Sequence, residues 1–209
     1  MEDELRIVPA DQAAPEDFDA LFGGRGTGHR CRCQRYRLER GETFAGTPIE
    51  ERAMRLLDQT RAGQSDASGT TSPATTGPVT TGLVAYLGAT PVGWAAVAPR
   101  SDYQGLRRAF TVPWQGRDED RADASVWAIT CLFVRAGHRR QGISRELAAA
   151  AVAFALEQGA RAVEAYPITT TAVIDEELHV GTVPTFEAAG LSEVAQPTKR
   201  RRVLRLDAG

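Results

Sequence analysis

The chain has 209 residues, of which 42% are hydrophobic and 25% charged, the balance of an ordinary globular protein with one substantial core. Its formal net charge of −2 gives no overall attraction for nucleic acid or for an anionic membrane. No apolar run approaches the length of about 18 residues that a membrane span needs, the acidic start MEDELRIVPA lacks the layout of a signal peptide, and the three cysteines suggest no disulfide framework, so we expect a cytoplasmic protein.

The first third of the chain is predicted to contain short regular elements around a basic loop. These are a strand, a helix, a glycine-rich basic loop and a longer helix, at 5–8, 15–22, 23–37 and 48–63. Pro15 suits the first turn of the first helix. In the second helix, Ile49, Met54 and Leu57 recur at helical spacing and Gly63 suits the end.

Residues 64–80, QSDASGTTSPATTGPVT, contain almost nothing that a core would bury. This composition predicts a flexible surface linker. A domain boundary is the alternative, but the roughly 60 residues before it hold too few apolar side chains to fold alone. We therefore expect one domain over residues 1–209, with an internal linker.

The rest of the chain is predicted to form most of a sheet. Residues 82–88 and 91–100 are apolar and joined by a tight turn, which is typical of a β-hairpin. Residues 125–134 are apolar except for Ser125 and Thr130, which is typical of a central strand. This strand should pair in parallel with the strand at 162–168, through a right-handed helical crossover. The other predicted elements are a helical patch within the polar segment 101–124, the crossover helix at 141–158, a short helix at 183–190 and a final strand from 201.

The stretch 134–144, VRAGHRRQGIS, places positive charge where a buried strand gives way to a helix. A helix N-terminus exposes unpaired backbone N–H groups and carries roughly half a positive charge. Gly142 lets the backbone approach a ligand closely. Arg139 and Arg140 add charge, and Ser144 offers a hydroxyl. These features indicate a site for an anion of the diphosphate type, and the alternative is an ordinary turn with solvated arginines.

The same region resembles the signature of the GNAT superfamily of acyl-CoA-dependent N-acyltransferases. The run CLFVRAGHRRQGISRELAAAAVAFALEQGARAVEAYPI, at 131–168, carries the family motif Arg/Gln-x-x-Gly-x-Gly/Ala between a strand and a helix, with Ser144 in the last place. PVGWAAVAPR resembles the family's second hairpin strand, and TFEAAGLSEV resembles its last helix and strand. The resemblance covers about residues 82–207, and the first 60 residues only loosely.

The resemblance implies an α/β protein of the GNAT fold, with a mixed, mostly antiparallel sheet, one splayed parallel strand pair and helices on both faces. It implies acetyl-CoA as co-substrate, with its pantetheine arm along the central strand and its thioester near a backbone N–H of Cys131 or Leu132. The residues implied to contact it are Leu132, Phe133, Val134, Arg139, Arg140, Gln141, Gly142, Ile143, Ser144 and Phe186.

The acid and base of the reaction are less evident from the sequence. Many family members use a Tyr of the last helix as general acid, but the aligned residue is Phe186, which we expect to pack against the pantetheine. Tyr166 is a substitute donor, although a buried core Tyr with a structural partner is the plainer interpretation. His179 is the candidate base, because a neutral imidazole can take an ammonium proton near pH 7. Cys131 is a candidate for an acyl-cysteine, against the common role of a small buried hydrophobe.

The acceptor site is expected beneath the N-terminal segment, by analogy with the family. Cys33 and Tyr36 are therefore candidate wall residues. Glu176, in the acidic loop 169–182, is a candidate partner for a cationic acceptor, and a solvated acidic loop is the alternative. His29, Cys31 and Cys33 are potential zinc ligands. They are only three and include no CxxC pair, whereas zinc sites have four ligands or three and a water, so we expect no metal site.

The basic run 199–206, KRRRVLRL, is interpreted as a strand with a solvated face, because no aromatic residues interleave it for base stacking. We thus expect no nucleic-acid or membrane partner, and a small-molecule amine as acceptor, with a homodimer as the family prior. The predicted function is transfer of an acetyl group from acetyl-CoA to a primary amine. The alternatives are a non-catalytic acyl-CoA-binding sensor and an acetyltransferase of protein lysines or N-termini.

Overall fold

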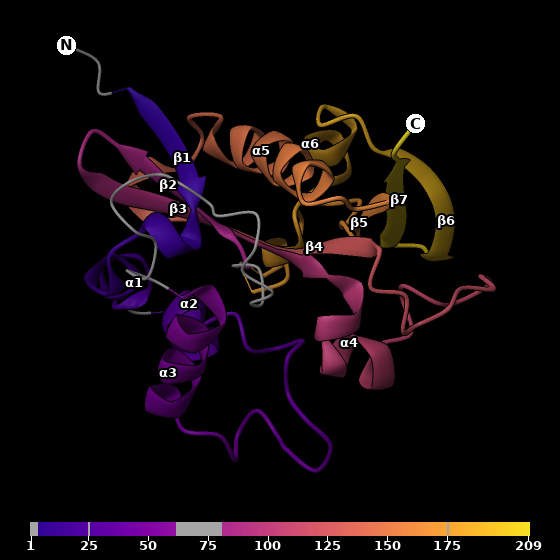
Figure 1. Cartoon of the computed structure of the whole chain (residues 1–209), viewed down its shortest axis with the longest axis horizontal. Coiled ribbons are helices and arrows are strands. Elements are labelled where there is room, and N and C mark those ends of the chain that lie inside the picture. The colour runs from indigo at the N-terminus through magenta and orange to yellow at the C-terminus, as the bar shows by residue number, and fades with distance from the viewer. Residues whose placement is uncertain (1–3, 25, 62–80, 175) are drawn as a thin grey trace.

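The apolar runs of the sequence form the middle of a seven-stranded sheet in the computed structural model, which describes residues 4–24, 26–61, 81–174 and 176–209 (Figure 1). The strands lie in the order β1-β2-β3-β4-β5-β7-β6, with bounds β1 Leu5–Pro9, β2 Leu83–Leu87, β3 Thr90–Pro99, β4 Val126–Val134, β5 Ala162–Ala165, β6 Ser192–Thr198 and β7 Arg201–Asp207. All neighbours are antiparallel except the parallel pair β4–β5. The predicted hairpin, the central strand and the parallel unit are confirmed.

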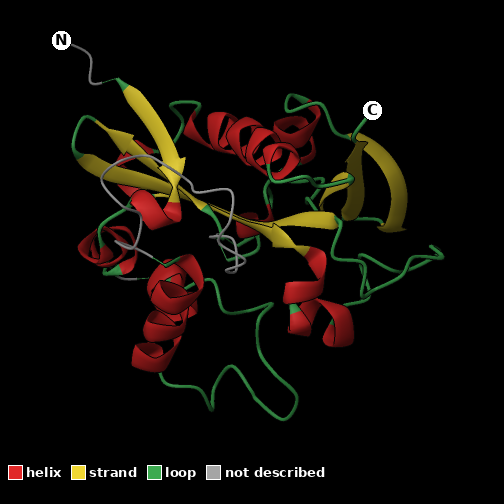
Figure 2. Ribbon diagram, in the orientation of Figure 1, coloured by secondary structure: helices red, strands yellow, loops and turns green. Residues whose placement is uncertain are grey.

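Helices cover both faces of this sheet (Figure 2). They are α1 Pro15–Phe22, α2 Thr27–Cys31, α3 Ile49–Thr60, α4 Gln104–Ala109, α5 Ile143–Glu157 and α6 Val183–Glu187. On one face α5 and α6 bury the largest apolar cluster, which includes Leu147 and Phe186. On the other face α1 and α3 pack over Trp94, whose ring meets Phe18 edge-on at 5.6 Å between centroids. The predicted GNAT architecture is thus confirmed.

Two predictions for the N-terminal part need correction. The segment expected to be a loop contains the single helical turn α2, which ends where Arg32 adopts a left-handed conformation at φ +46°. In α3 the buried face carries Arg52, Leu56 and Thr60, whereas Met54 is 59% exposed. The prediction was therefore wrong for Met54, whereas Leu57 packs against the core cluster and Ile49 is partly buried.

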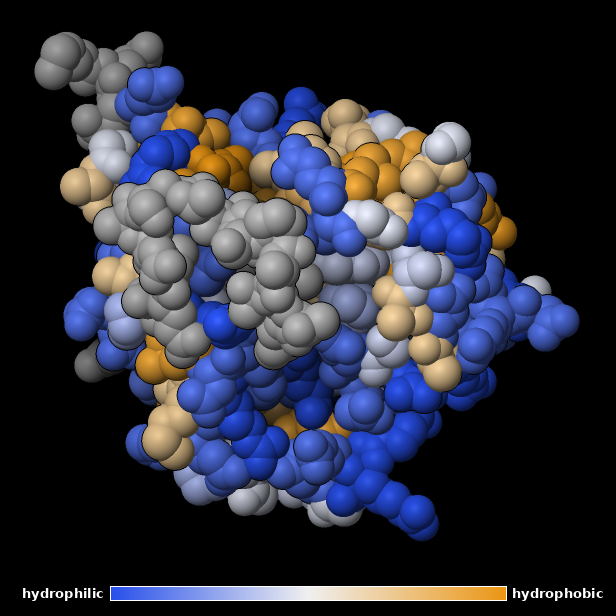
Figure 3. Space-filling view, in the orientation of Figure 1, coloured by the Kyte–Doolittle hydropathy of each residue, from blue (hydrophilic) through white to orange (hydrophobic). Residues whose placement is uncertain are grey.

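The predicted linker at 64–80 lies outside the described residues. β1 and β2, which precede and follow it in the chain, are neighbours in the sheet and pair over the whole length of both strands. Within the part of the chain that the structure describes, no helix is long and apolar enough to cross a membrane. The face seen in Figure 3 is mostly hydrophilic, with small separate apolar patches.

An irregularity in β4 decides which side chains face the N-terminal helices. Ala96 pairs with Cys131 while Val97 pairs with Ile129, so Thr130 is an extra residue, a β-bulge. In a regular strand residues two apart share a face, but here Ile129 and Leu132 lie in the α5 cluster. The bulge thereby turns Cys131 toward the opposite face, against α1 and Trp94.

The parallel pair separates at the same point. Pairing of β4 with β5 ends at Ile129 and Ala165, whereas pairing of β4 with β3 continues to Val134. The last five residues of β4 therefore have a strand on one side only. This opening is the splay that the resemblance implied, and the α5 N-terminus lies just beyond its end (Figure 1).

Candidate functional site

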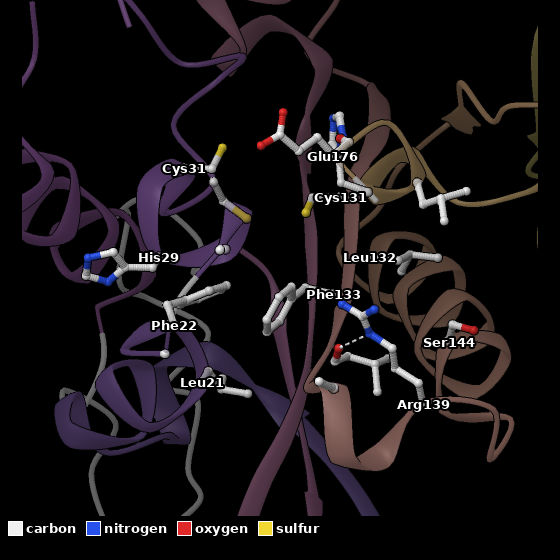
Figure 4. Close-up of a pocket in the computed structure, with 18 of the residues that line it drawn as sticks. Leu21, Phe22, His29, Cys31, Cys131, Leu132, Phe133, Arg139, Ser144 and Glu176 are labelled. Carbon is white, nitrogen blue, oxygen red and sulfur yellow. Dashed lines mark hydrogen bonds between the residues drawn. The ribbon is translucent and has the colours of Figure 1, made fainter. Parts of the chain in front are cut away.

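A cavity of about 880 Å³ occupies the opening beside the end of β4. Its walls come from the segment between α1 and Tyr36, from β4 after the bulge, from the start of α5 and from the loop before α6. Figure 4 shows Glu176 and Cys131 toward one end of this space and Arg139 toward the other. The predicted residues that line it are Cys33, Tyr36, Cys131, Leu132, Phe133, Val134, Arg139, Arg140, Gly142, Ile143, Ser144, Glu176 and His179.

The N-terminus of α5 has the properties of an anion site. Gly142 is its N-cap with φ +80°, and no side chain caps the first turn. A Cβ at Gly142 would meet nothing within 4 Å, so the space in front of the helix is open. Arg140, two residues before Gly142, also has positive φ, +64°. Gln141 is exposed and is not among the residues that line the cavity, so its predicted contact gains no support.

The roof of the cavity comes close to β4 because of a glycine in α2. A Cβ at Gly28 would lie 2.7 Å from the Phe133 ring, a distance that no side chain tolerates. On the other side the Phe22 ring lies 5.2 Å from the Phe133 ring between centroids. These contacts fix Phe133 as a wall residue between the two ends of the cavity.

Tyr36 and His179 meet at the end of the cavity away from α5. The Tyr36 hydroxyl lies 3.3 Å from His179 Nε2, and His179 Nδ1 lies 2.6 Å from the carbonyl oxygen of Glu176. Burial is the main cause that lowers the pKa of His179 to about 4, so its ring is neutral near pH 7. A neutral ring that donates from Nδ1 to a carbonyl must accept at Nε2, so we assign the Tyr36 hydroxyl as the donor of this bond.

Cys33 and Cys31 are held as thiols. Trp94 donates from Nε1 to Cys33 Sγ at 3.0 Å, and contact with Cys131, followed by burial, raises the pKa of Cys33 well above its ordinary value. Burial likewise raises the pKa of Cys31. Because the thiolate is the nucleophile, these positions suit packing better than catalysis.

Besides Gln141, two predicted site residues are not on the cavity wall. Tyr166 is buried and donates to Glu164 Oε2 at 2.9 Å, and burial raises its pKa well above the ordinary value. Phe186 is 0% exposed within the core under α6, in contact range of Gly181. Tyr166 is therefore a buried core residue with a structural partner, the plainer of its two interpretations, and Phe186 lies in the core and not on the cavity wall.

Glu164 belongs to a buried ionic cluster behind β5. It accepts from Arg100, Arg117 and Arg205 at 3.0, 2.5 and 2.8 Å. Burial opposes the charged form, but these arginines prevail and keep the pKa of Glu164 lowered. The prediction that 199–206 has a solvated face is therefore wrong for Arg205, because its guanidinium neutralises a buried carboxylate.

Among the described residues no group of three or more His, Cys, Asp or Glu side chains is placed to hold a metal ion. Glu176 pairs with Arg30 across the cavity, and Asp175 lies outside the described residues. The wall residues that were not anticipated from sequence include Thr130, Arg30 and Arg35. The bulge that presents Thr130 has no sequence signal, and the two arginines were part of a basic loop without a recognisable motif.

A splayed parallel strand pair with an open helix N-terminus at its mouth defines an acyl-CoA-dependent transferase. A family model described as "Acetyltransferase (GNAT) family" matches residues 51–173, more than half of the chain. The chain therefore belongs to this family, and acetyl-CoA is its co-substrate. The open space at Gly142, the uncapped α5 N-terminus and the unpaired edge of β4 fit this molecule.

Solved structures share the fold at low sequence identity. An N-acetyltransferase from Staphylococcus aureus Mu50 is 12% identical with a TM-score of 0.54, over 98% of each chain. A GNAT-family acetyltransferase from Streptococcus pneumoniae is 16% identical with a TM-score of 0.52, over 99% of this chain and 100% of that one. YncA from Salmonella typhimurium, a putative acetyltransferase solved with its cofactor acetyl-CoA, is 13% identical with a TM-score of 0.54, over 97% and 93%. Among curated proteins, no sequence matches the chain significantly.

Proposed function

We propose that this chain is an N-acetyltransferase that moves the acetyl group of acetyl-CoA to a primary amine of a small molecule, by direct attack with both substrates bound. The observation that carries this proposal is the Tyr36–His179 hydrogen bond, which lies in the same cavity as the open edge of β4 and the α5 N-terminus. Binding, acyl positioning and proton transfer are thus available in one continuous space.

The donor end of the cavity supplies binding and orientation. Acetyl-CoA contributes an activated thioester carbonyl. The N–H groups at Gly142, Ile143 and Ser144, with the dipole of α5, would hold its diphosphate. The unpaired edge of β4 would hold its extended arm, and a backbone N–H at Cys131 or Leu132 would stabilise negative charge on the carbonyl oxygen.

The Tyr36–His179 pair would move the proton. As the amine nitrogen bonds to the carbonyl carbon, its proton passes to the Tyr36 oxygen while the Tyr36 proton passes to His179 Nε2. When the carbon–sulfur bond breaks, the same pair returns a proton to the thiolate. The pair thereby takes over both roles, in place of the family tyrosine for which this chain has the buried Phe186.

The enclosure of the acceptor end favours a small molecule. Tyr36 is only 7% exposed, and His179, in the 3-10 turn Leu178–Val180 before α6, is half-buried. Arg30 from α2 joins Glu176 from that loop by an ion pair across the cavity mouth. A lysine on a protein surface would have to displace this pair, whereas a small amine need not.

The test is a thermal-shift titration with acetyl-CoA, followed by a thiol-release assay of the same sample against a panel of small amines and lysine peptides. Binding to the native state raises the unfolding midpoint by mass action. We expect a shift, and thiol release with small amines. A shift without release on any amine would instead indicate a sensor, and release only with peptides would indicate a protein-modifying enzyme.

A further inference from the structure

A second cavity of about 470 Å³ continues from the acceptor end of the first. The two share Tyr36, His179, Glu176 and Arg35, so the Tyr36–His179 pair stands at their junction. Beyond it the second cavity is lined by Arg201 and by apolar groups, among them the side chains of Phe110 and Ile168. The α5 N-terminus contributes nothing to this second cavity.

The charges of the second cavity do not cancel. Its two described carboxylates are already paired, Glu176 with Arg30 and Glu177 with Arg200 at 2.7 Å. Among the described residues, neither Arg35 nor Arg201 makes an ion pair.

Arg201 is held in place although its charge is not matched. Its Nη2 donates to the carbonyl oxygen of Tyr166 at 2.6 Å, and its Nε is buried without a hydrogen-bond partner in the described part of the chain. Arg201 is the first residue of β7, and an isolated antiparallel β-bridge to Ile168 fixes its backbone further. A guanidinium so oriented keeps donors available for a ligand, at little further loss of side-chain freedom.

The two arginines act on the proton-transferring pair. After burial, the positive charges of Arg35 and Arg201 are among the causes that lower the pKa of His179. Burial raises the pKa of Tyr36, and Arg201 and Arg35 act in the opposite direction there. A simple ammonium ion would meet the same repulsion, whereas an acceptor that brings its own negative charge would cancel it.

We propose that the acceptor is an amino carboxylate, whose carboxylate binds Arg35 and Arg201 in the second cavity while its amine faces Tyr36 and His179. This inference rests on the proposed N-acetyltransferase function. Guanidinium groups bind carboxylates through paired, charge-assisted hydrogen bonds, and the second cavity brings two of them, those of Arg35 and Arg201, to one space. The positive field would also favour the neutral form of the bound amine, which is the form that attacks.

The experiment compares matched acceptors that differ only in the carboxylate. Each α- and ω-amino acid is assayed beside its decarboxylated amine, for example phenylalanine with phenethylamine and γ-aminobutyrate with propylamine, by thiol release from acetyl-CoA. We expect kcat/KM to favour the carboxylated member of the accepted pair by about 10- to 100-fold. Arg35→Gln and Arg201→Gln should each abolish most of that preference, and Arg201→Lys should retain part of it.

The matched control is Arg202→Gln, which removes the neighbouring arginine that pairs with the exposed Glu193 at 3.0 Å on β6. It should leave the preference unchanged. Equal or better turnover of the decarboxylated amines by the wild type would overturn the inference while the acetyltransferase function stands. The inference also fails if both glutamine variants keep the wild-type preference.

Binding separates failure of the inference from failure of the function. The same matched pairs are titrated calorimetrically into protein saturated with CoA. If no acceptor releases thiol but the amino acid binds more tightly than its amine and Arg201→Gln removes that difference, the carboxylate site stands and the acetyltransferase function falls. If neither member of any pair binds or reacts, the carboxylate site is rejected.

Discussion

Tyr36 and His179 are 143 positions apart in sequence, yet the Tyr36 hydroxyl lies 3.3 Å from His179 Nε2. One comes from the N-terminal segment and the other from the short 3-10 turn Leu178–Val180 before α6. Their rings are also tilted against each other at 5.9 Å between centroids. The pair thus stands between the donor end of the cavity and its acceptor extension.

Removal of either member of the pair should slow the chemical step. We expect Tyr36→Phe and His179→Gln each to lower kcat by about 100-fold with little change in the KM for acetyl-CoA. The double variant should be no slower than the slower single variant, because both act in one proton path. Tyr86→Phe is the control. The Tyr86 hydroxyl donates to Asp17 Oδ2 at 2.6 Å, neither residue lines the cavity, and kcat of the variant should stay at the wild-type value. Additive losses in the double variant would contradict the relay.

Protein stability should depend on pH through His179. Burial lowers the pKa of His179 in the folded chain from 6.5 to about 4. The unfolded chain therefore binds the proton first as the pH falls, and stability is lost between about pH 6.5 and pH 4, with no contribution from this group above that window. At about pH 5 the loss should be about 2 kcal/mol of unfolding free energy.

Urea unfolding of the wild type and of His179→Gln at pH 7.5, 6 and 5 checks this value. The difference between the two proteins in unfolding free energy cancels the other titrating groups. That difference should change by about 2 kcal/mol from pH 7.5 to pH 5, in favour of the variant. A difference that is independent of pH would show that His179 titrates normally.

Negative charge at the α5 N-terminus should prevent acetyl-CoA binding. In Gly142→Glu a carboxylate stands where the diphosphate would lie, and we expect the Kd for acetyl-CoA to rise roughly tenfold or more. Gly116→Glu is the matched control, because Gly116 also has positive φ, +73°, and open space around its Cβ position, but lies outside the cavity. It carries the same backbone strain and the same charge. Isothermal titration should show loss of affinity for acetyl-CoA in Gly142→Glu alone. Equal affinity in the two variants would contradict binding of the diphosphate at the α5 N-terminus.

The buried cluster behind β5 should contribute to stability, not to catalysis. Glu164→Gln removes the one fully buried carboxylate that Arg100, Arg117 and Arg205 share, and among the described residues leaves them only the partly exposed Glu119 and, for Arg205, Asp207. We expect a loss of about 3 kcal/mol of unfolding free energy. Glu193→Gln breaks only an exposed pair with Arg202 and should cost less than about 1 kcal/mol. Denaturant unfolding at pH 7.5 compares the two. At a temperature where Glu164→Gln remains folded, its kcat should be close to that of the wild type.

Most of the fold could be predicted from local sequence pattern. The apolar run at 125–134, the helix that follows it and the glycine at 142 each specify their own conformation, because strand burial, helical periodicity and positive φ are local requirements. The donor end of the cavity lies within this continuous stretch. The sequence therefore predicted which residues of this stretch line the cavity, with Gln141 as the exception.

The acceptor end could not be predicted in the same way. Its walls come from α2, from β4 beyond the Thr130 bulge and from the loop before α6, and no local pattern states which of these segments meet. Arg201 illustrates the difference. In sequence it is one arginine of a basic run. In the structure it donates to the carbonyl oxygen of Tyr166, just after β5, and lines the second cavity.

Sequence alone determined the family, the order of the elements and the part of the cavity wall at the start of α5, since each depends on residues that are neighbours in the chain. Only the tertiary structure decided that Tyr166 and Phe186 are structural, that Tyr36 meets His179, and that Arg35 and Arg201 lack carboxylate partners in the described part of the chain. The physical reason is that burial, the pKa of a side chain and the balance of charge in a cavity are sums over groups that are distant in sequence, and only folding brings those groups together.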